Sequence, residues 1–102
     1  MCRASLFRAV GPDELADIRR LGYLRNPPGI VVKYFAVTRA QAIWFARQAV
    51  AAFGDPPYAI IQVETVVSYL PKISVDRGIR IVVLDDNDLA GLKPRIIRYN
   101  VA

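Results

Sequence analysis

The sequence predicts an α+β domain in which two helices pack on a mainly antiparallel sheet. With 102 residues the chain is long enough for one hydrophobic core and too short for two, so residues 1–102 should form a single domain. Two segments have helical periodicity with start and stop signals, and the others are rich in β-branched and aromatic residues. Their order along the chain is β-α-β-α-β-(β)-β-β.

The first strand and the first helix are separated by a Gly-Pro pair. Leu6–Val10 reads as a short strand, with Arg8 in its middle either at an edge facing water or held for a purpose. Pro12 suits the first helical position, and the helix should end at Leu21, before a glycine. Glu14 is interpreted as an acid of the first helical turn, where the helix dipole favours negative charge.

The segment from Val31 to Gly54 contains the best-defined strand and helix of the chain. β-branched and aromatic residues predict the strand, and Thr38, three residues before Gln41, has the spacing of a capping box. Trp44 points away from the apolar stripe of the helix, so it either covers a neighbouring loop or marks a contact surface. The stripe consists of Ala42, Phe45, Ala46, Ala49, Val50 and Phe53, at helical spacing.

The second half of the chain reads mainly as strands joined by turns. Residues 58–67 form a long strand, apolar on both sides, and residues 72–75 form a short strand or a crossing loop. Residues 79–84 are a buried strand, residues 85–92 a turn or short helix, and residues 96–101 a last strand. The prolines of the segment 23–29 predict a loop before the central strand.

The residue types that the chain lacks exclude several kinds of catalytic and metal site. The chain has no histidine and one cysteine, Cys2, so no metal site of ordinary type is expected and serine or cysteine triads are excluded. Catalysis would have to rest on carboxylates, arginines, tyrosines or hydroxyls. No apolar run reaches the roughly 20 residues of a membrane span, and no signal peptide is evident. We therefore expect a soluble protein that is cytoplasmic where it is made.

The net charge of +5 suits a polyanionic partner such as RNA, DNA or a dinucleotide pyrophosphate. The basic residues are scattered, with Arg19-Arg20 the one adjacent pair, and they form no lysine-rich or RGG-like tract. A solvated basic surface is the alternative interpretation.

Four short segments resemble the small ADP-ribosyltransferase-like domains of bacterial polymorphic toxins. They are LFRAV at residues 6–10, KYFAVTRAQAIWFARQ at 33–48, PYAIIQVE at 57–64 and VVLDDNDLAGLKP at 82–94. The resemblance covers most of the chain and implies a split sheet whose two halves border a cleft for NAD. It also implies transfer of ADP-ribose to a macromolecular acceptor, protein or nucleic acid, and an immunity protein as a partner.

The resemblance, together with the chemistry that NAD cleavage requires, points to three residues of the NAD site. Arg8 matches the basic residue of the first strand and would clamp the phosphates or ribose, while Tyr34 would form a flat wall beside the nicotinamide ring. Thr38 matches a serine or threonine that follows the second strand in arginine-type members.

The catalytic carboxylate is the point of departure from the family. Cleavage of the nicotinamide–ribose bond develops positive charge on the sugar, which a nearby carboxylate stabilises. In the family a glutamate stands at the start of a late strand, where this chain has Arg80, and an arginine would repel the developing cation. Glu64 could project into the cleft, although an outward-facing strand residue is the alternative. Asp76 and Asp85, which flank the late strand, are more simply turn residues.

These expectations leave the domain either an active transferase or a relative that has kept the fold and lost the reaction. Two other functions remain open: a nucleic-acid-binding module that uses the basic surface, and an interaction protein that forms a homodimer through the Trp44 face and edge strands.

Overall fold

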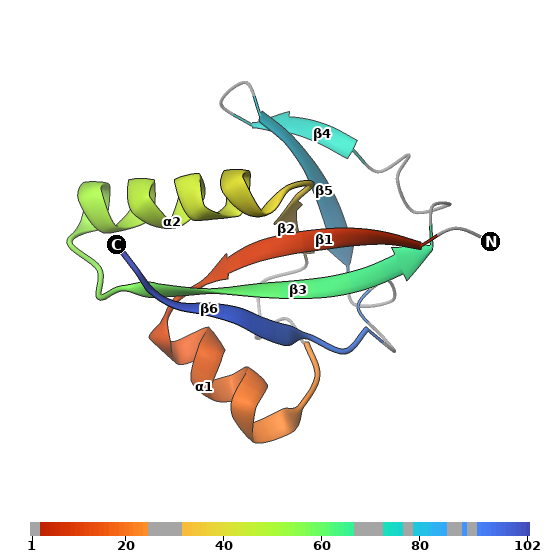
Figure 1. The fold of residues 1–102 in the computed structure, drawn as a ribbon, viewed down its shortest axis with the longest axis horizontal. Coiled ribbons are helices and arrows are strands. Elements are labelled where there is room, and N and C mark those ends of the chain that lie inside the picture. Colours follow the sequence, from red (N-terminus) through yellow and green to blue (C-terminus); the bar gives the residue numbers. More distant parts are fainter. Residues whose placement is uncertain (1–2, 25–31, 67–72, 77–78, 86–88, 90–91) are drawn as a thin grey trace.

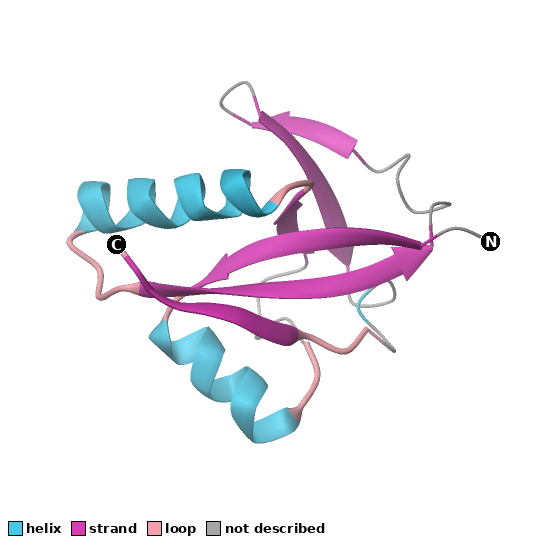
Figure 2. Ribbon diagram, viewed as in Figure 1, coloured by secondary structure: helices cyan, strands magenta, loops and turns pink. Residues whose placement is uncertain are grey.

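A computed structural model describes residues 3–24, 32–66, 73–76, 79–85, 89 and 92–102. The fold is α+β, with two helices and an antiparallel sheet, and the predicted order of elements is confirmed (Figures 1 and 2). The strands are β1 (Arg3–Val10), β2 (Val32–Ala36), β3 (Tyr58–Val66), β4 (Ile73–Asp76), β5 (Ile79–Asp85) and β6 (Arg95–Val101). The helices are α1 (Pro12–Leu21) and α2 (Arg39–Phe53).

The six strands are arranged in the order β4-β5-β2-β1-β3-β6, and every described pairing is antiparallel. β1 pairs with β3 along its whole length, from Arg3 opposite Val66 to Val10 opposite Ala59. β1 and β2 are joined by one described pair, Phe7 opposite Ala36. The sheet therefore has two halves, β1-β3-β6 and β2-β5-β4, and Figure 1 shows β5 steeply inclined to the strands of the other half.

The two helices lie on opposite sides of the β1-β3-β6 half (Figure 1). α1 begins with Pro12 in its first turn and ends at Gly22, whose φ of 76° lies in the left-handed region that glycine adopts without strain. α2 begins after Thr38 and ends at Gly54, with φ 66°. The start and end positions predicted for both helices are thus confirmed.

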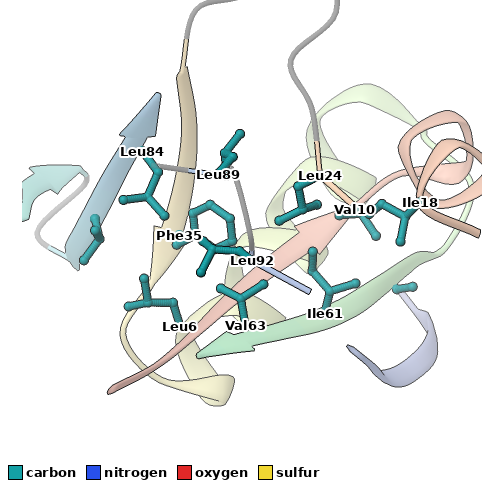
Figure 3. Close-up of a cluster of buried hydrophobic side chains, with 12 residues drawn as sticks. Leu6, Val10, Ile18, Leu24, Phe35, Ile61, Val63, Leu84, Leu89 and Leu92 are labelled. Atoms are coloured by element: carbon teal, nitrogen blue, oxygen red, sulfur yellow. The ribbon is translucent and has the colours of Figure 1, made fainter. Parts of the chain in front are cut away.

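The larger hydrophobic cluster lies on the α1 side and connects the two halves of the sheet (Figure 3). Phe35 of β2 is completely buried in it, between residues of β1 and β3 on one side and of β5 on the other. This shared core holds the halves together where the backbone ladder between β1 and β2 is short. Its buried members are Leu6, Val10, Ile18, Leu24, Phe35, Ala59, Ile61, Val63, Val82, Leu84, Leu89 and Leu92.

The smaller cluster lies under α2. Ala42 and Ala46 are buried against Ala36, Ile60 and Val101, so the small side chains of α2 let the helix approach the sheet closely. The predicted stripe is correct at these positions and wrong at Phe53, the last residue of the helix, which is 74% exposed.

Element boundaries differ from the expectation in a few places. β1 begins at Arg3 rather than Leu6, because its ladder with β3 extends along residues of low β propensity. The sequence left residues 72–75 as either a short strand or a crossing loop. The structure has a strand there, β4 (Ile73–Asp76). Three predicted features lie outside the described residues: the loop at 25–29, the end of the long strand at Val67 and most of the turn or short helix at 85–92.

Candidate functional site

A pocket of about 200 Å³ lies between α2 and the place where the two halves of the sheet meet. Phe7 and Ala36, the pair that joins β1 to β2, both line it, as does Ile81, which pairs with Ala36 in β5. The described residues that line it are Phe7, Arg8, Ala9, Tyr34, Phe35, Ala36, Ala42, Phe45, Ala49, Tyr58 and Ile81.

The described lining residues are mostly aromatic and aliphatic, and Arg8 is the charged residue among them. Alternation along the strands places Phe7, Ala9 and Tyr34 on the α2 side of the sheet. Arg8, between Phe7 and Ala9, points to the α1 side toward Glu14 and borders the pocket at the gap between β1 and β2. Tyr34 is 53% exposed, so its ring stands at the entrance of the pocket rather than in the core. The pocket therefore offers flat apolar walls beside a cation.

The guanidinium of Arg8 is held by three hydrogen bonds. Its Nε and Nη2 donate to the two carboxylate oxygens of Glu14, each over 2.8 Å. Its Nη1 donates to the main-chain oxygen of Tyr34 over 2.9 Å. This last bond crosses from β1 to β2 next to the Phe7–Ala36 pair, so the side chain connects strands whose ladder stops there.

Glu14 also faces Lys33, which is nearly buried although it is charged. Lys33 is 5% exposed, and its Nζ lies 3.4 Å from Glu14 Oε2. Burial raises the pKa of the Glu14 carboxyl, but the hydrogen bonds and charges of Arg8 and Lys33 outweigh it, so this pKa lies below its usual value of 4.5. Glu14 is therefore ionised at neutral pH, in a cluster with two cations.

Tyr58 forms another wall of the pocket and is fixed by its own hydroxyl. The hydroxyl donates to Asp55 Oδ2 over 2.8 Å, and the ring lies within 3.6 Å of the position that a Cβ would take at Gly11. Burial raises the pKa of Tyr58, and the hydrogen bond to Asp55 and the charge of Asp55 raise it further. This tyrosine is therefore a neutral, oriented side chain at neutral pH.

Of the three ligand residues predicted from the sequence, the structure brings two together at the pocket and leaves the third outside its described lining. Arg8 and Tyr34 both line the pocket and contact each other. Thr38 is not among the lining residues, and its hydroxyl accepts a hydrogen bond of 3.2 Å from the Gln41 main-chain N–H, which caps α2. The other half of the predicted capping box is wrong, because Gln41 Oε1 is buried and has no hydrogen-bond partner in the described part of the chain.

Glu64, the candidate catalytic carboxylate, is not among the described residues that line the pocket. Glu64 is exposed on β3 opposite Ser5, two residues beyond Gln62, which pairs with Phe7. Arg80 pairs with Val75 in the β4–β5 ladder, and its side chain is outside the described part of the structure, as are those of Asp76 and Asp85. None of the described residues that line the pocket carries a carboxylate.

Sequence reasoning did not find the roles of Glu14, Lys33 and Tyr58. Arg8 itself could have indicated the role of Glu14. An arginine in a central strand needs a carboxylate partner, and Glu14 is close to Arg8 along the chain. Lys33 could be read as the single charge of an apolar strand. The position of Tyr58 depends on the pairing of β1 with β3, which is not visible in local sequence.

Trp44 is 37% exposed on the outer side of α2, as its place off the apolar stripe predicts. Its ring contacts Phe45 edge to face, with centroids 5.2 Å apart. Phe45 lines the pocket, so Trp44 packs against the back of one pocket wall.

Comparisons of the chain with protein-family models, with curated proteins and with solved structures gave no match. Neither α1 nor α2 is long and apolar enough to cross a membrane. In the described part of the chain, no three acidic or cysteine side chains come together as metal ligands would.

Proposed function

We propose that this domain binds NAD in the manner of an ADP-ribosyltransferase-like fold, with one ring of the dinucleotide in the pocket beneath α2. The observation that carries the proposal is the meeting of Arg8, Tyr34 and the Phe7–Ala36 pair at one pocket. The sequence resemblance implies a cleft of this kind between two halves of a split sheet. It also implies a first-strand arginine and a second-strand aromatic residue beside the ligand.

The size of the pocket supports a ring rather than a whole dinucleotide. Pockets that enclose drug-sized ligands usually have volumes of about 300 to 1,000 Å³. A pocket of about 200 Å³ with aromatic walls suits a single flat heterocycle such as nicotinamide. The ribose and phosphates would then extend past the exposed ring of Tyr34 onto the surface.

Arg8 retains donors for such a ligand. A guanidinium has five N–H groups, and three of them are engaged by Glu14 and the main chain of Tyr34. The remaining two could bond a phosphate or ribose oxygen. Glu14 partly neutralises the cation, so Arg8 would act mainly through the fixed direction of its N–H groups.

Binding of NAD has more support than transfer of ADP-ribose. A positively charged sugar in the transition state needs a carboxylate near the reacting carbon. Among the described residues none of the pocket walls supplies one, and Glu14 is engaged by two cations. We therefore propose an NAD-binding domain in which the transferase reaction is lost, with Glu64 the residue to test for residual activity.

The test is a titration of the protein with NAD, followed by NMR chemical shifts and calorimetry. We expect saturable binding, with the largest shifts at Phe7, Ala36 and Tyr58. Tyr34→Ala should weaken binding at least fivefold, because stacking on an aromatic ring contributes about 1 to 3 kcal/mol. Tyr34→Phe, which keeps the ring, should bind as the wild type does.

The controls separate the pocket from general surface effects. Tyr23→Ala removes a tyrosine that is also about half exposed, at 51%, and lies outside the pocket lining, so it should leave the affinity unchanged. Absence of saturable binding at millimolar NAD would overturn the proposal. Release of nicotinamide by the wild type, lost in Glu64→Gln, would contradict the loss of transfer while leaving the NAD site in place.

A further inference from the structure

A second surface with unused chemistry lies along β6, the outer strand of the β1-β3-β6 half. We call it the β6 rim and define it by Arg19, Lys93, Arg95, Arg98 and Tyr99, all of which are exposed. Figure 1 shows β6 at the margin of the sheet with α1 beside it. None of these residues lines the pocket beneath α2.

The cations of the β6 rim have no acidic partner among the described residues. Arg19, Lys93, Arg95 and Arg98 have no salt bridge within the described part of the chain, whereas the adjacent Arg20 is paired with Asp17 over 2.8 Å. The sequence has no acidic residue from Leu89 to its last residue. The rim therefore carries several positive charges that form no ion pair within the described part of the chain.

Register places two of these cations on the same side of the sheet. Arg95 pairs with Gln62 and Arg98 pairs with Ile60, and Gln62 and Ile60 are two residues apart on β3. The irregular ladder between Ile60 and Ile61 makes this possible, because it inserts a residue into β6. Without that irregularity, two residues three apart would point to opposite sides.

The fifth residue of the rim is an aromatic platform. Tyr99 is 47% exposed, and the guanidinium carbon of Arg19 lies 5.5 Å from the centre of its ring. A cation against a ring in this geometry holds the ring in place. Tyr99 directly follows Arg98, so its ring faces the α1 side of β6, where Arg19 lies, whereas Arg95 and Arg98 face the other side of this edge strand. A single strand that crosses the edge would meet both the cations and the ring.

We propose that the β6 rim binds single-stranded nucleic acid, with phosphates on Arg95 and Arg98 and a base stacked on Tyr99. Proteins that bind single strands combine a cationic track with exposed aromatic rings on which bases stack, and the rim has both. An acidic peptide would use the cations but would gain little from the tyrosine. This inference is independent of NAD binding, since the two surfaces share no residue.

The test is fluorescence anisotropy of a labelled oligonucleotide of about twelve nucleotides at several salt concentrations. Arg95→Ala/Arg98→Ala should weaken binding at least tenfold. Each phosphate contact contributes about 0.7 to the slope of log affinity against log salt, so the double variant should flatten the slope by about 1.4. Arg39→Ala/Arg47→Ala removes the same charge from exposed positions on α2 and should have little effect.

Tyr99 provides a separate readout. Tyr99→Ala should weaken binding at least fivefold without changing the salt slope, and Tyr99→Phe should bind as the wild type does. Circular dichroism of each variant verifies that it folds. Three results would overturn the proposal: equal losses from the α2 and β6 double variants, tighter binding of duplex than of single strands, or equal binding of polyglutamate with no effect of Tyr99→Ala.

Discussion

Arg8 and Glu14 form a bidentate ion pair in which both carboxylate oxygens accept hydrogen bonds of 2.8 Å. The pair joins the middle of β1 to the first turn of α1, six residues further along the chain. Bidentate geometry fixes the orientation of both side chains as well as their distance. It thereby orients the arginine that lines the proposed NAD pocket.

Glu14→Gln should destabilise the protein by about 3 kcal/mol. The amide cannot accept both charged hydrogen bonds, and it leaves Lys33 buried without an anion, which is costly in a partly desolvated cluster. Urea unfolding at neutral pH measures the change. Asp13→Asn removes the neighbouring, exposed acid of the same helical turn and should cost less than about 1 kcal/mol, since only the helix-dipole interaction is lost. Equal losses in both variants would show that the ion pair is not the cause.

The free energy of unfolding should decrease in acid as the Glu14 carboxyl becomes protonated. The pKa of Glu14 is lowered in the folded protein. Its contribution to the free energy of unfolding is therefore complete above pH 4.5, the ordinary pKa, and is lost as the pH falls through the folded pKa. In that interval the unfolded chain binds more protons than the folded one. The free energies of unfolding of wild type and Glu14→Gln should therefore converge when measured from about pH 6 to about pH 2. A constant difference over this range would contradict the assignment.

Asp55→Asn should lower the pKa of Tyr58 toward its ordinary value of 10.0. Burial remains, but the charge of Asp55, which raises the Tyr58 pKa, is removed. Absorbance titration of phenolate formation, compared with Tyr58→Phe, isolates this tyrosine from the other four. Because the folded pKa is raised, the associated stability is present below pH 10.0 and is lost as the pH rises through the folded value. An unchanged pKa in Asp55→Asn would exclude the proposed hydrogen bond.

Thr38→Ala should destabilise the protein by about 1 kcal/mol, because the N-cap acceptor of α2 is lost. Thr38→Ser keeps the hydroxyl and should stay within a few tenths of the wild type. Chemical denaturation compares the three proteins. Their affinities for NAD should be equal, since Thr38 does not line the pocket. A selective loss of affinity in Thr38→Ala would restore the ligand role that the sequence suggested.

The fold class was predictable because its signals are local. Gly22 and Gly54 end the helices where expected, and the apolar runs become strands in the expected order. The packing of the elements on one another was harder to predict. Val10 and Ile18, for example, share a core cluster only because α1 packs back over β1. Which residues of two distant strands face each other is set by register, and local composition does not encode it.

The candidate site was predictable only in part, for a related reason. Arg8 and Tyr34 were identified and do line one pocket. Thr38 was assigned to a ligand, but a hydroxyl at that position satisfies the helix start first. Glu14 was assigned to the helix dipole, because its interactions with Arg8 and Lys33 arise only when α1 packs on the sheet.

The pairing of β1 with β3 also constrains the order in which the chain can fold. Arg3 is opposite Val66, so the first strand of the chain cannot complete its longest ladder until residue 66 is available. During synthesis β1 would remain unpaired with β3 until β3 emerges, whereas α1 and α2 can form earlier from local contacts. The centre of the sheet would thus be among the last parts to assemble, and closing so long a loop should make folding slow for a domain of this size.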